Sequence, residues 1–178
     1  MFNHSYHFYL INKTKVESQD LLEQWIYGFR AEKRRYIAVV ELYKYSTYVI
    51  KFYPVSHKLS PNKFNVILND FHPAPIIRTC INIMLQILRT DAKANFGFIA
   101  SNTIHKNFIE PKYYNQRFRI YKKLMSYWFP DESFFHTINE ANSTYLLLNR
   151  ANQNLEMLTE KIVVMFIQYF DALDLESN

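Results

Sequence analysis

The pattern of hydrophobic and polar positions predicts that strands and helices alternate along this chain. Short runs rich in β-branched and aromatic residues are typical of strands, whereas apolar residues three and four positions apart are typical of helices. The sequence predicts strands over Tyr6–Ile11, Tyr36–Tyr43, Thr47–Tyr53, Phe64–Leu68, Phe96–Ala100, Phe134–Ile138 and Thr144–Asn149. Lys44-Tyr45-Ser46 separates the second strand from the third, so these two are expected to form a hairpin.

The same pattern predicts four helices. The first follows Ser18-Gln19-Asp20, which looks like a helix start, and its apolar residues continue at helical spacing to Phe29. The others are expected over Ile76–Arg89, Tyr114–Trp128 and about 152–173. The last helix has a wide apolar face, which we expect either to cover the chain's own sheet or to extend into a homodimer interface.

Composition and length favour one folded domain. The chain has 178 residues, of which 49% are hydrophobic and 21% charged, and this balance excludes the disordered and fibrous classes. The sequence has no linker, repeat or low-complexity tract, so residues 1–178 are expected to form a single domain. Its predicted class is α/β in the wider sense (α+β), with a mixed, mostly antiparallel sheet flanked by helices.

Cysteine usage and hydropathy bear on the compartment. Cys80 is the single cysteine, so no intramolecular disulfide is expected. The segment Met1–Leu10 has no long apolar run, and no stretch reaches the roughly 18–20 apolar residues that cross a bilayer. The sequence therefore predicts a cytoplasmic protein without a membrane partner.

The net charge of +5 permits nucleic acid as a partner without requiring it. One group of basic residues lies in and before the Tyr114–Trp128 helix, and these are the candidate nucleic-acid-binding residues: Lys112, Arg117, Arg119, Lys122 and Lys123. The alternative is a solvated helix face. A second basic group, Arg30 to Arg35, would favour nucleic acid if it folds close to the first.

The order strand, helix, hairpin, strand, long helix, strand, helix, hairpin resembles the GNAT acyltransferase superfamily. Phe96–Asn102 looks like the fifth strand of that family with its following polar residue, and Arg119–Leu124 looks like the next helix. The hairpin over Phe134–Asn149 resembles the last two strands. The run Tyr145–Asn149 is also similar to one in uncharacterised bacterial proteins.

The resemblance implies an acyl-CoA cofactor, acetyl-CoA or another, and an N-acyltransferase activity. In active members a glycine-rich loop before the long central helix binds the pyrophosphate of acyl-CoA. Here the corresponding loop, Asn69–Pro75, has no glycine and contains an aspartate and two prolines, which lack N–H groups. The two glycines of the chain, Gly28 and Gly97, lie elsewhere. No cofactor is therefore expected, unless the acyltransferase alternative holds.

If the chain is an acyltransferase, four residues become candidates for its site. The resemblance implies Tyr121 as the general acid that protonates the CoA thiolate and Glu41 as the base that accepts a proton from the amine. Arg78 and Asn102 are the candidate cofactor-binding residues. The alternatives are a core tyrosine, a strand carboxylate that faces solvent, and an ordinary turn asparagine.

Metal and nucleophile chemistry find little support in the sequence. His4 and His7 are three positions apart, which on a strand places them on opposite faces, so no metal site is expected. Cys80 lies in an apolar helix, where an inert packing thiol is expected. The first hypothesis is a non-catalytic binding or interaction protein, acting on an unidentified protein partner or as a homodimer. The alternatives are an acyl-CoA-dependent N-acyltransferase and a basic nucleic-acid-associated module.

Overall fold

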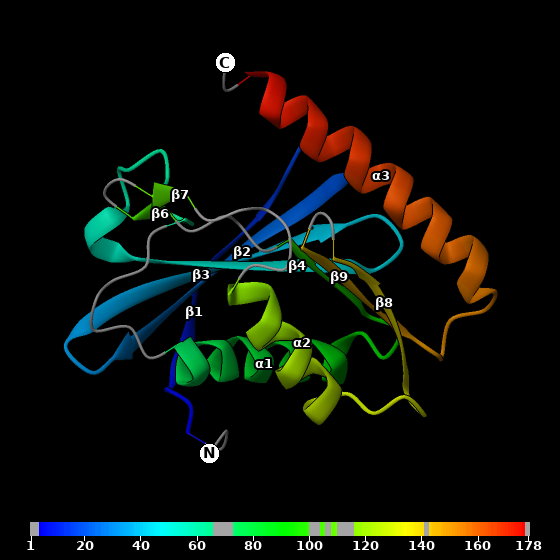
Figure 1. The fold of residues 1–178 in the computed structure, drawn as a ribbon, viewed down its shortest axis with the longest axis horizontal. Helices are drawn as coiled ribbons and strands as arrows, with labels where there is room; N and C mark the ends of the chain where they lie inside the picture. Colours follow the sequence, from blue (N-terminus) through cyan, green and yellow to red (C-terminus); the bar gives the residue numbers. More distant parts are fainter. Residues whose placement is uncertain are drawn as a thin grey trace.

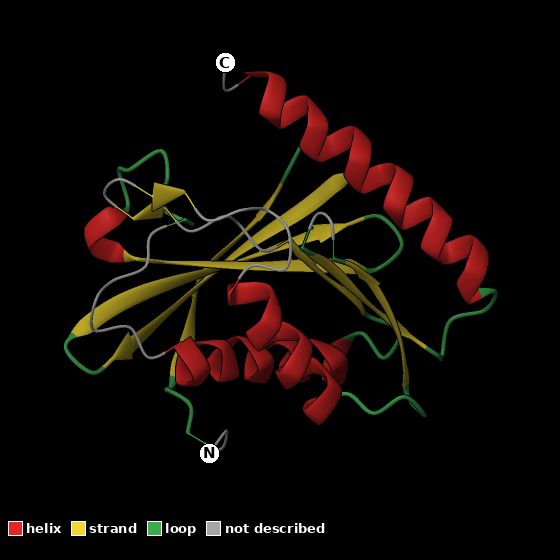
Figure 2. Cartoon of the chain, in the orientation of Figure 1, coloured by secondary structure: helices red, strands yellow, loops and turns green. Residues whose placement is uncertain are grey.

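The computed structural model of the protein describes residues 4–65, 73–99, 104–105, 108–109, 116–140 and 143–176. Its strands are β1 (Phe8–Lys15), β2 (Leu21–Ala31), β3 (Arg34–Tyr43), β4 (Thr47–Pro54), β5 (Asn95–Ile99), β6 (Ile104–His105), β7 (Phe108–Ile109), β8 (Phe134–Asn139) and β9 (Thr144–Asn149). Its helices are the single turn η1 (Val55–His57) and α1 (Pro73–Thr90), α2 (Gln116–Trp128) and α3 (Leu155–Glu176). Figures 1 and 2 show their arrangement.

A seven-stranded sheet in the order β1-β2-β3-β4-β5-β9-β8 forms the centre of the molecule. All of its pairs are antiparallel except β4–β5, so the predicted mixed, mostly antiparallel sheet flanked by helices is confirmed. β6 and β7 form a separate two-stranded ladder. Helices α1 and α2 lie on one face of the large sheet and α3 crosses the other face (Figure 1).

Each face of the sheet has its own hydrophobic core. The larger core lies under α1 and α2 and includes Phe96, Ile81 and Leu124, none of which is exposed to solvent. The smaller core lies under α3, where Ile162 and Phe166 pack against Val49 of β4. Side chains of a strand alternate between the two faces, so β3, β4 and β9 each contribute to both cores.

The helix predicted from Leu21 to Phe29 is wrong, because this segment forms the strand β2. Its apolar residues fit a helical spacing, but Tyr27, Phe29 and Ala31 also alternate and all three are buried on the α1 side. β2 pairs with β1 along one edge and with β3 along the other. This tertiary pairing, together with the β-favouring residues of the segment, outweighs the local pattern.

The strand predicted over Phe64–Leu68 is also corrected. Phe64 and Asn65 belong to a turn, and the remaining three residues lie outside the described part of the chain. The strand that precedes α1 and pairs with β5 is therefore β4, which makes the strand–helix–strand unit β4–α1–β5. β1 to β4 follow one another without an intervening α-helix, so the element order differs from the predicted one.

The two glycines occupy strands, and other residues make the turns. Positive φ angles occur at Glu32 between β2 and β3, at Tyr45 and Ser46 between β3 and β4, and at Ser143 and Asn154. A Cβ at Gly97 would lie 2.7 Å from Cε2 of Phe166. Gly97 therefore lets α3 approach the sheet closely where a larger residue would hold it away.

Candidate functional site

The candidate site lies where β4 and β5 separate. Their parallel register runs from Thr47 opposite Asn95 to Val49 opposite Gly97. β4 then continues to Pro54 along β3, and β5 continues to Ile99 along β9. The carboxyl ends of parallel strands at a change of strand direction are a frequent place for ligands in α/β sheets.

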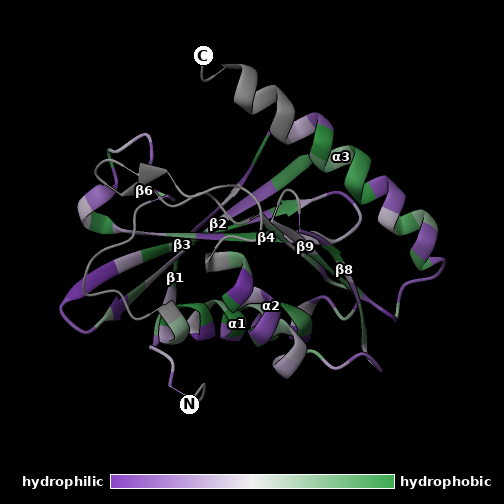
Figure 3. Ribbon diagram, viewed as in Figure 1, coloured by the Kyte–Doolittle hydropathy of each residue, from purple (hydrophilic) through white to green (hydrophobic). Residues whose placement is uncertain are grey.

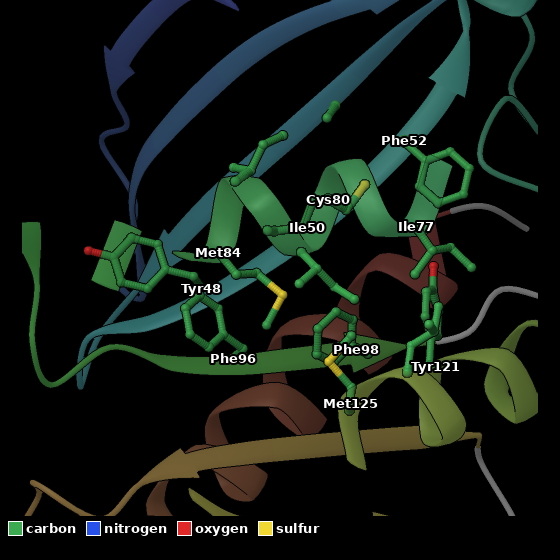
Figure 4. Close-up of a cluster of buried hydrophobic side chains, with 14 of the residues drawn as sticks. Tyr48, Ile50, Phe52, Ile77, Cys80, Met84, Phe96, Phe98, Tyr121 and Met125 are labelled. Atoms are coloured by element: carbon green, nitrogen blue, oxygen red, sulfur yellow. The ribbon is translucent and has the colours of Figure 1, made fainter. Parts of the chain in front are cut away.

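On the α1 side, the site is occupied by apolar side chains. Figure 4 shows Phe52 of β4, Phe98 of β5, Ile77 of α1 and Tyr121 of α2 gathered around this point. All four are buried, with exposures between 1% and 7%. The described part of this face is thus packed with hydrocarbon and aromatic rings.

Tyr121 extends from the buried face of α2 into this cluster. Its ring lies 5.3 Å from the ring of Phe98, and 7% of the residue is exposed. It shares its helix face with Phe118 and Met125, both fully buried in the same core. This setting is that of a core tyrosine, one of the two alternatives that the sequence left open for Tyr121.

Glu41 lies on β3 and faces α3. Tyr43 is two residues away on the same side of the strand, and its hydroxyl donates a hydrogen bond to Oε2 of Glu41 at 2.9 Å. Nζ of Lys51, on β4, pairs with the same oxygen at 2.7 Å. Only 7% of Glu41 is exposed, so the alternative of a carboxylate facing solvent is wrong.

The candidate acid and base are on opposite faces of the sheet. The side chains of Ala38 and Val40 join the core under α1 and α2, whereas Tyr43 joins the core under α3. Because strand side chains alternate, Glu41 lies on the α3 side with Tyr43. Tyr121 lies in the α1 and α2 layer, so the structure does not bring these two residues together.

The environment of Glu41 also affects its tyrosine neighbours. Burial and the carboxylate of Glu41 both raise the pKa of Tyr43, and the same two causes raise the pKa of Tyr169 on α3. The rings of Tyr43 and Tyr169 are 5.1 Å apart. This polar group is enclosed between α3 and the sheet, and both phenols keep their protons at neutral pH.

Arg78 lies on α1 and contacts α2. Its Cζ is 3.4 Å from the centroid of the Trp128 ring, so the guanidinium covers the indole in a cation–π contact. Burial lowers the pKa of Arg78. The other candidate cofactor-binding residue, Asn102, lies outside the described residues, as do residues 69–72 of the predicted cofactor loop.

The basic candidates on α2 are only partly described. Arg119 and Lys123 are exposed, whereas Nζ of Lys122 pairs with Oε1 of Glu140 at 3.0 Å. Lys112 lies outside the described residues, and nothing is described of the side chain of Arg117, which lies in the first turn of α2. The Arg30–Arg35 segment spans the turn between β2 and β3, which lies at the left end of the sheet in Figure 1. In the same view, α2 lies below the middle of the sheet.

Sequence reasoning missed several residues that shape these surroundings. Lys51 and Tyr43 hold the carboxylate of Glu41, and Trp128 holds Arg78. The hairpin register would have placed Lys51 near Glu41, because Glu41 is opposite Val49. No local signal could have found the stacking of Trp128 on Arg78, since it depends on how α1 and α2 pack.

The outer face of α3 is mixed in character. Figure 3 shows hydrophobic and hydrophilic stretches alternating along its described part. The exposed aliphatic residues are Met157, Val163, Val164 and Ile167, with exposures between 37% and 55%. The charged residues Glu156, Glu160 and Lys161 are exposed between them.

Metal-binding clusters and membrane-spanning helices are both missing from the residues that the structure describes. No group of three or more His, Cys, Asp and Glu side chains in this part of the chain could hold a metal ion. No described helix has the length and apolar character that a membrane crossing requires.

Cys80 provides a test of the core under α1. It is buried, and burial raises the pKa of its thiol to about 12. An ordinary cysteine has a pKa of about 8.5, so the thiol of the unfolded chain loses its proton at a lower pH than the thiol of the folded chain. The contribution of Cys80 to the free energy of unfolding therefore declines as the pH rises from about 8.5 towards the pKa of the folded thiol. We expect a disulfide reagent such as Ellman's reagent to leave the native chain unlabelled at about pH 8 and to label the urea-unfolded chain fully. Fast labelling of the native chain would contradict this burial.

Comparisons with family models, with curated proteins and with solved structures find no match for this chain.

Proposed function

We propose that this chain is a non-catalytic binding protein that shares its sheet layout, but not its chemistry, with acyltransferases of the GNAT superfamily. The observation that carries the proposal is the separation of Glu41 and Tyr121 by the sheet. A general base and a general acid of one transfer reaction must both reach the reacting atoms, within hydrogen-bond distance or through one water. Side chains on opposite faces of a packed sheet do not meet that requirement.

The contacts of each residue support the same conclusion. A base accepts a proton from the amine, so its carboxylate must not be held in the ionised form by other groups. Oε2 of Glu41 accepts from Tyr43 and pairs with the cation of Lys51 beneath α3, and both contacts favour the ionised carboxylate. The ring of Tyr121 packs on Phe98 among apolar side chains, an environment suited to holding α2 against the sheet.

One observation favours the alternative of an acyl-CoA-dependent N-acyltransferase. The parallel pairing of β4 with β5 ends at Val49 and Gly97, while both strands continue along other neighbours. A sheet that opens between parallel strands offers a place for an extended ligand. The alternative therefore requires its own test.

Thermal unfolding with acetyl-CoA provides that test. A ligand at about 100 times its dissociation constant stabilises the native state by about 2.7 kcal/mol, which raises the unfolding midpoint by several degrees. We expect millimolar acetyl-CoA to shift the midpoint no more than the nucleotide half of CoA, which carries the phosphates without the pantetheine arm and thioester. A larger shift with acetyl-CoA than with this control would show that the chain binds the cofactor and would favour the acyltransferase alternative.

A further inference from the structure

The contact between Arg78 and Trp128 brings together buried N–H donors that have no acceptor among the described residues. Arg78 lies in the second turn of α1 and Trp128 is the last residue of α2, so the pair joins the two helices on the same side of the sheet. The guanidinium carbon is 3.4 Å from the indole centroid. Both side chains are half-buried, which places the pair at the boundary between the core and solvent.

Three N–H donors of this pair lack an acceptor. Nε and Nη1 of Arg78 and Nε1 of Trp128 are all buried, and none has a hydrogen-bond partner among the residues that the structure describes. Folded proteins satisfy nearly all buried polar atoms, and a buried charged donor without an acceptor is especially unfavourable. These three donor nitrogens belong to two side chains in direct contact, so a single acceptor group beside the pair could bind more than one of them.

The positive charge of Arg78 indicates that an acceptor beside it would be an anion. No ion pair joins Arg78 to a carboxylate in the described ranges, whereas Lys122, Lys44 and Lys51 each have an acidic partner. Burial lowers the pKa of Arg78, the direction expected for a cation that is partly removed from water. An anion at this position would restore the missing interaction.

We propose that Arg78 and Trp128 form a binding site for a small oxyanion, namely a carboxylate or phosphate group. A guanidinium presents N–H donors in a planar fork that matches two oxygens of either group. The indole covers one face of the guanidinium and leaves its edges for in-plane hydrogen bonds, while the indole N–H supplies a neutral third donor. This inference goes beyond the proposed function, because it names a ligand chemistry and holds with or without acyl transfer.

Nuclear magnetic resonance of the two indole N–H groups tests the site directly. The chain has two tryptophans, and the Nε1 of Trp25 already donates to Glu23 at 2.8 Å, so it serves as an internal reference. Trp128→Phe identifies the second signal by removing it. We expect sodium phosphate, sodium acetate or both to shift the Trp128 signal in a saturable manner, relative to sodium chloride of equal ionic strength. A response to one salt alone identifies the oxyanion, and no saturable shift with either salt would overturn the proposal.

Matched arginine variants test whether the shift of the Trp128 signal depends on Arg78. Arg78→Met should abolish the shift, whereas Arg89→Met, which removes an exposed arginine from the same helix, should retain it. Arg78→Lys keeps the charge but loses the planar fork, so we expect at least a several-fold weaker response. An unchanged shift in Arg78→Met or Arg78→Lys would show that the anion binds elsewhere and would overturn the site. If Arg78→Met does not fold, Arg78→Lys and the wild-type titration decide the matter.

Discussion

Replacing Lys51 with methionine is expected to lower the free energy of unfolding by about 3 kcal/mol, the lower end of the range for breaking a buried ion pair. The lower end applies because 26% of the Lys51 side chain is exposed, compared with 10% of the Glu41 side chain. The cost arises because the carboxylate of Glu41 stays buried under α3 after it loses its cation. Urea unfolding monitored by circular dichroism measures the change.

Two further variants separate this explanation from a general loss of packing. Glu41→Gln combined with Lys51→Met removes both charges, so the double variant should recover most of the lost stability. Lys44→Met removes a cation from a more exposed pair with Asp20 and should cost less than about 1 kcal/mol. If the double variant is as unstable as Lys51→Met alone, Glu41 is not the group that Lys51 neutralises.

Replacing Phe166 with alanine should cost about 3–5 kcal/mol of stability, the usual range for a buried phenylalanine. Phe166 is one of the α3 residues that pack on the centre of the sheet, and it contacts Gly97 of β5 and Tyr43 of β3. Its loss leaves a cavity that α3 cannot close without shifting its other contacts. Phe135→Ala, which alters an exposed phenylalanine on β8, should have a small effect in the same urea titration.

Gly97 and Phe166 are expected to be strongly coupled. Gly97→Ala alone should cost about 1–3 kcal/mol, because the added Cβ meets the Phe166 ring at 2.7 Å. In the Phe166→Ala background that ring is absent, so the same Gly97→Ala change should cost little. A double-mutant cycle measures the difference, and simple additivity of the two effects would contradict the placement of α3.

Much of the sheet could be predicted because most of its strands have a recognisable local sequence pattern. β3 and β4 are two β-branched and aromatic runs with a short connection, and β8 and β9 show the same pattern around Asn139 and Glu140. β2 was not predictable in this way, because Leu21, Trp25 and Phe29 fit a helix as well as a strand. Its pairing with β1 and β3 decides between the two, and no local window contains that information.

The candidate site was harder to predict than the fold. A sequence can suggest that a tyrosine and a glutamate serve one reaction, but it does not state on which face of a sheet each lies. For Glu41 the face follows from strand alternation once Tyr43 is known to contact α3. For Tyr121 it follows from α2 packing on Phe98. Both facts depend on which helix covers which face, and that arrangement is set by packing across the whole domain.

The separation of Glu41 from Tyr121 makes acyl transfer the most direct test of the proposed function. The measurement is release of the CoA thiol from acetyl-CoA in the presence of polyamines and lysine-containing peptides. We predict that the wild-type chain, Tyr121→Phe and Glu41→Gln all release thiol at the rate of the protein-free control. Release by the wild-type chain that falls in both variants would show that the two residues act together, and would contradict a non-catalytic role for this protein.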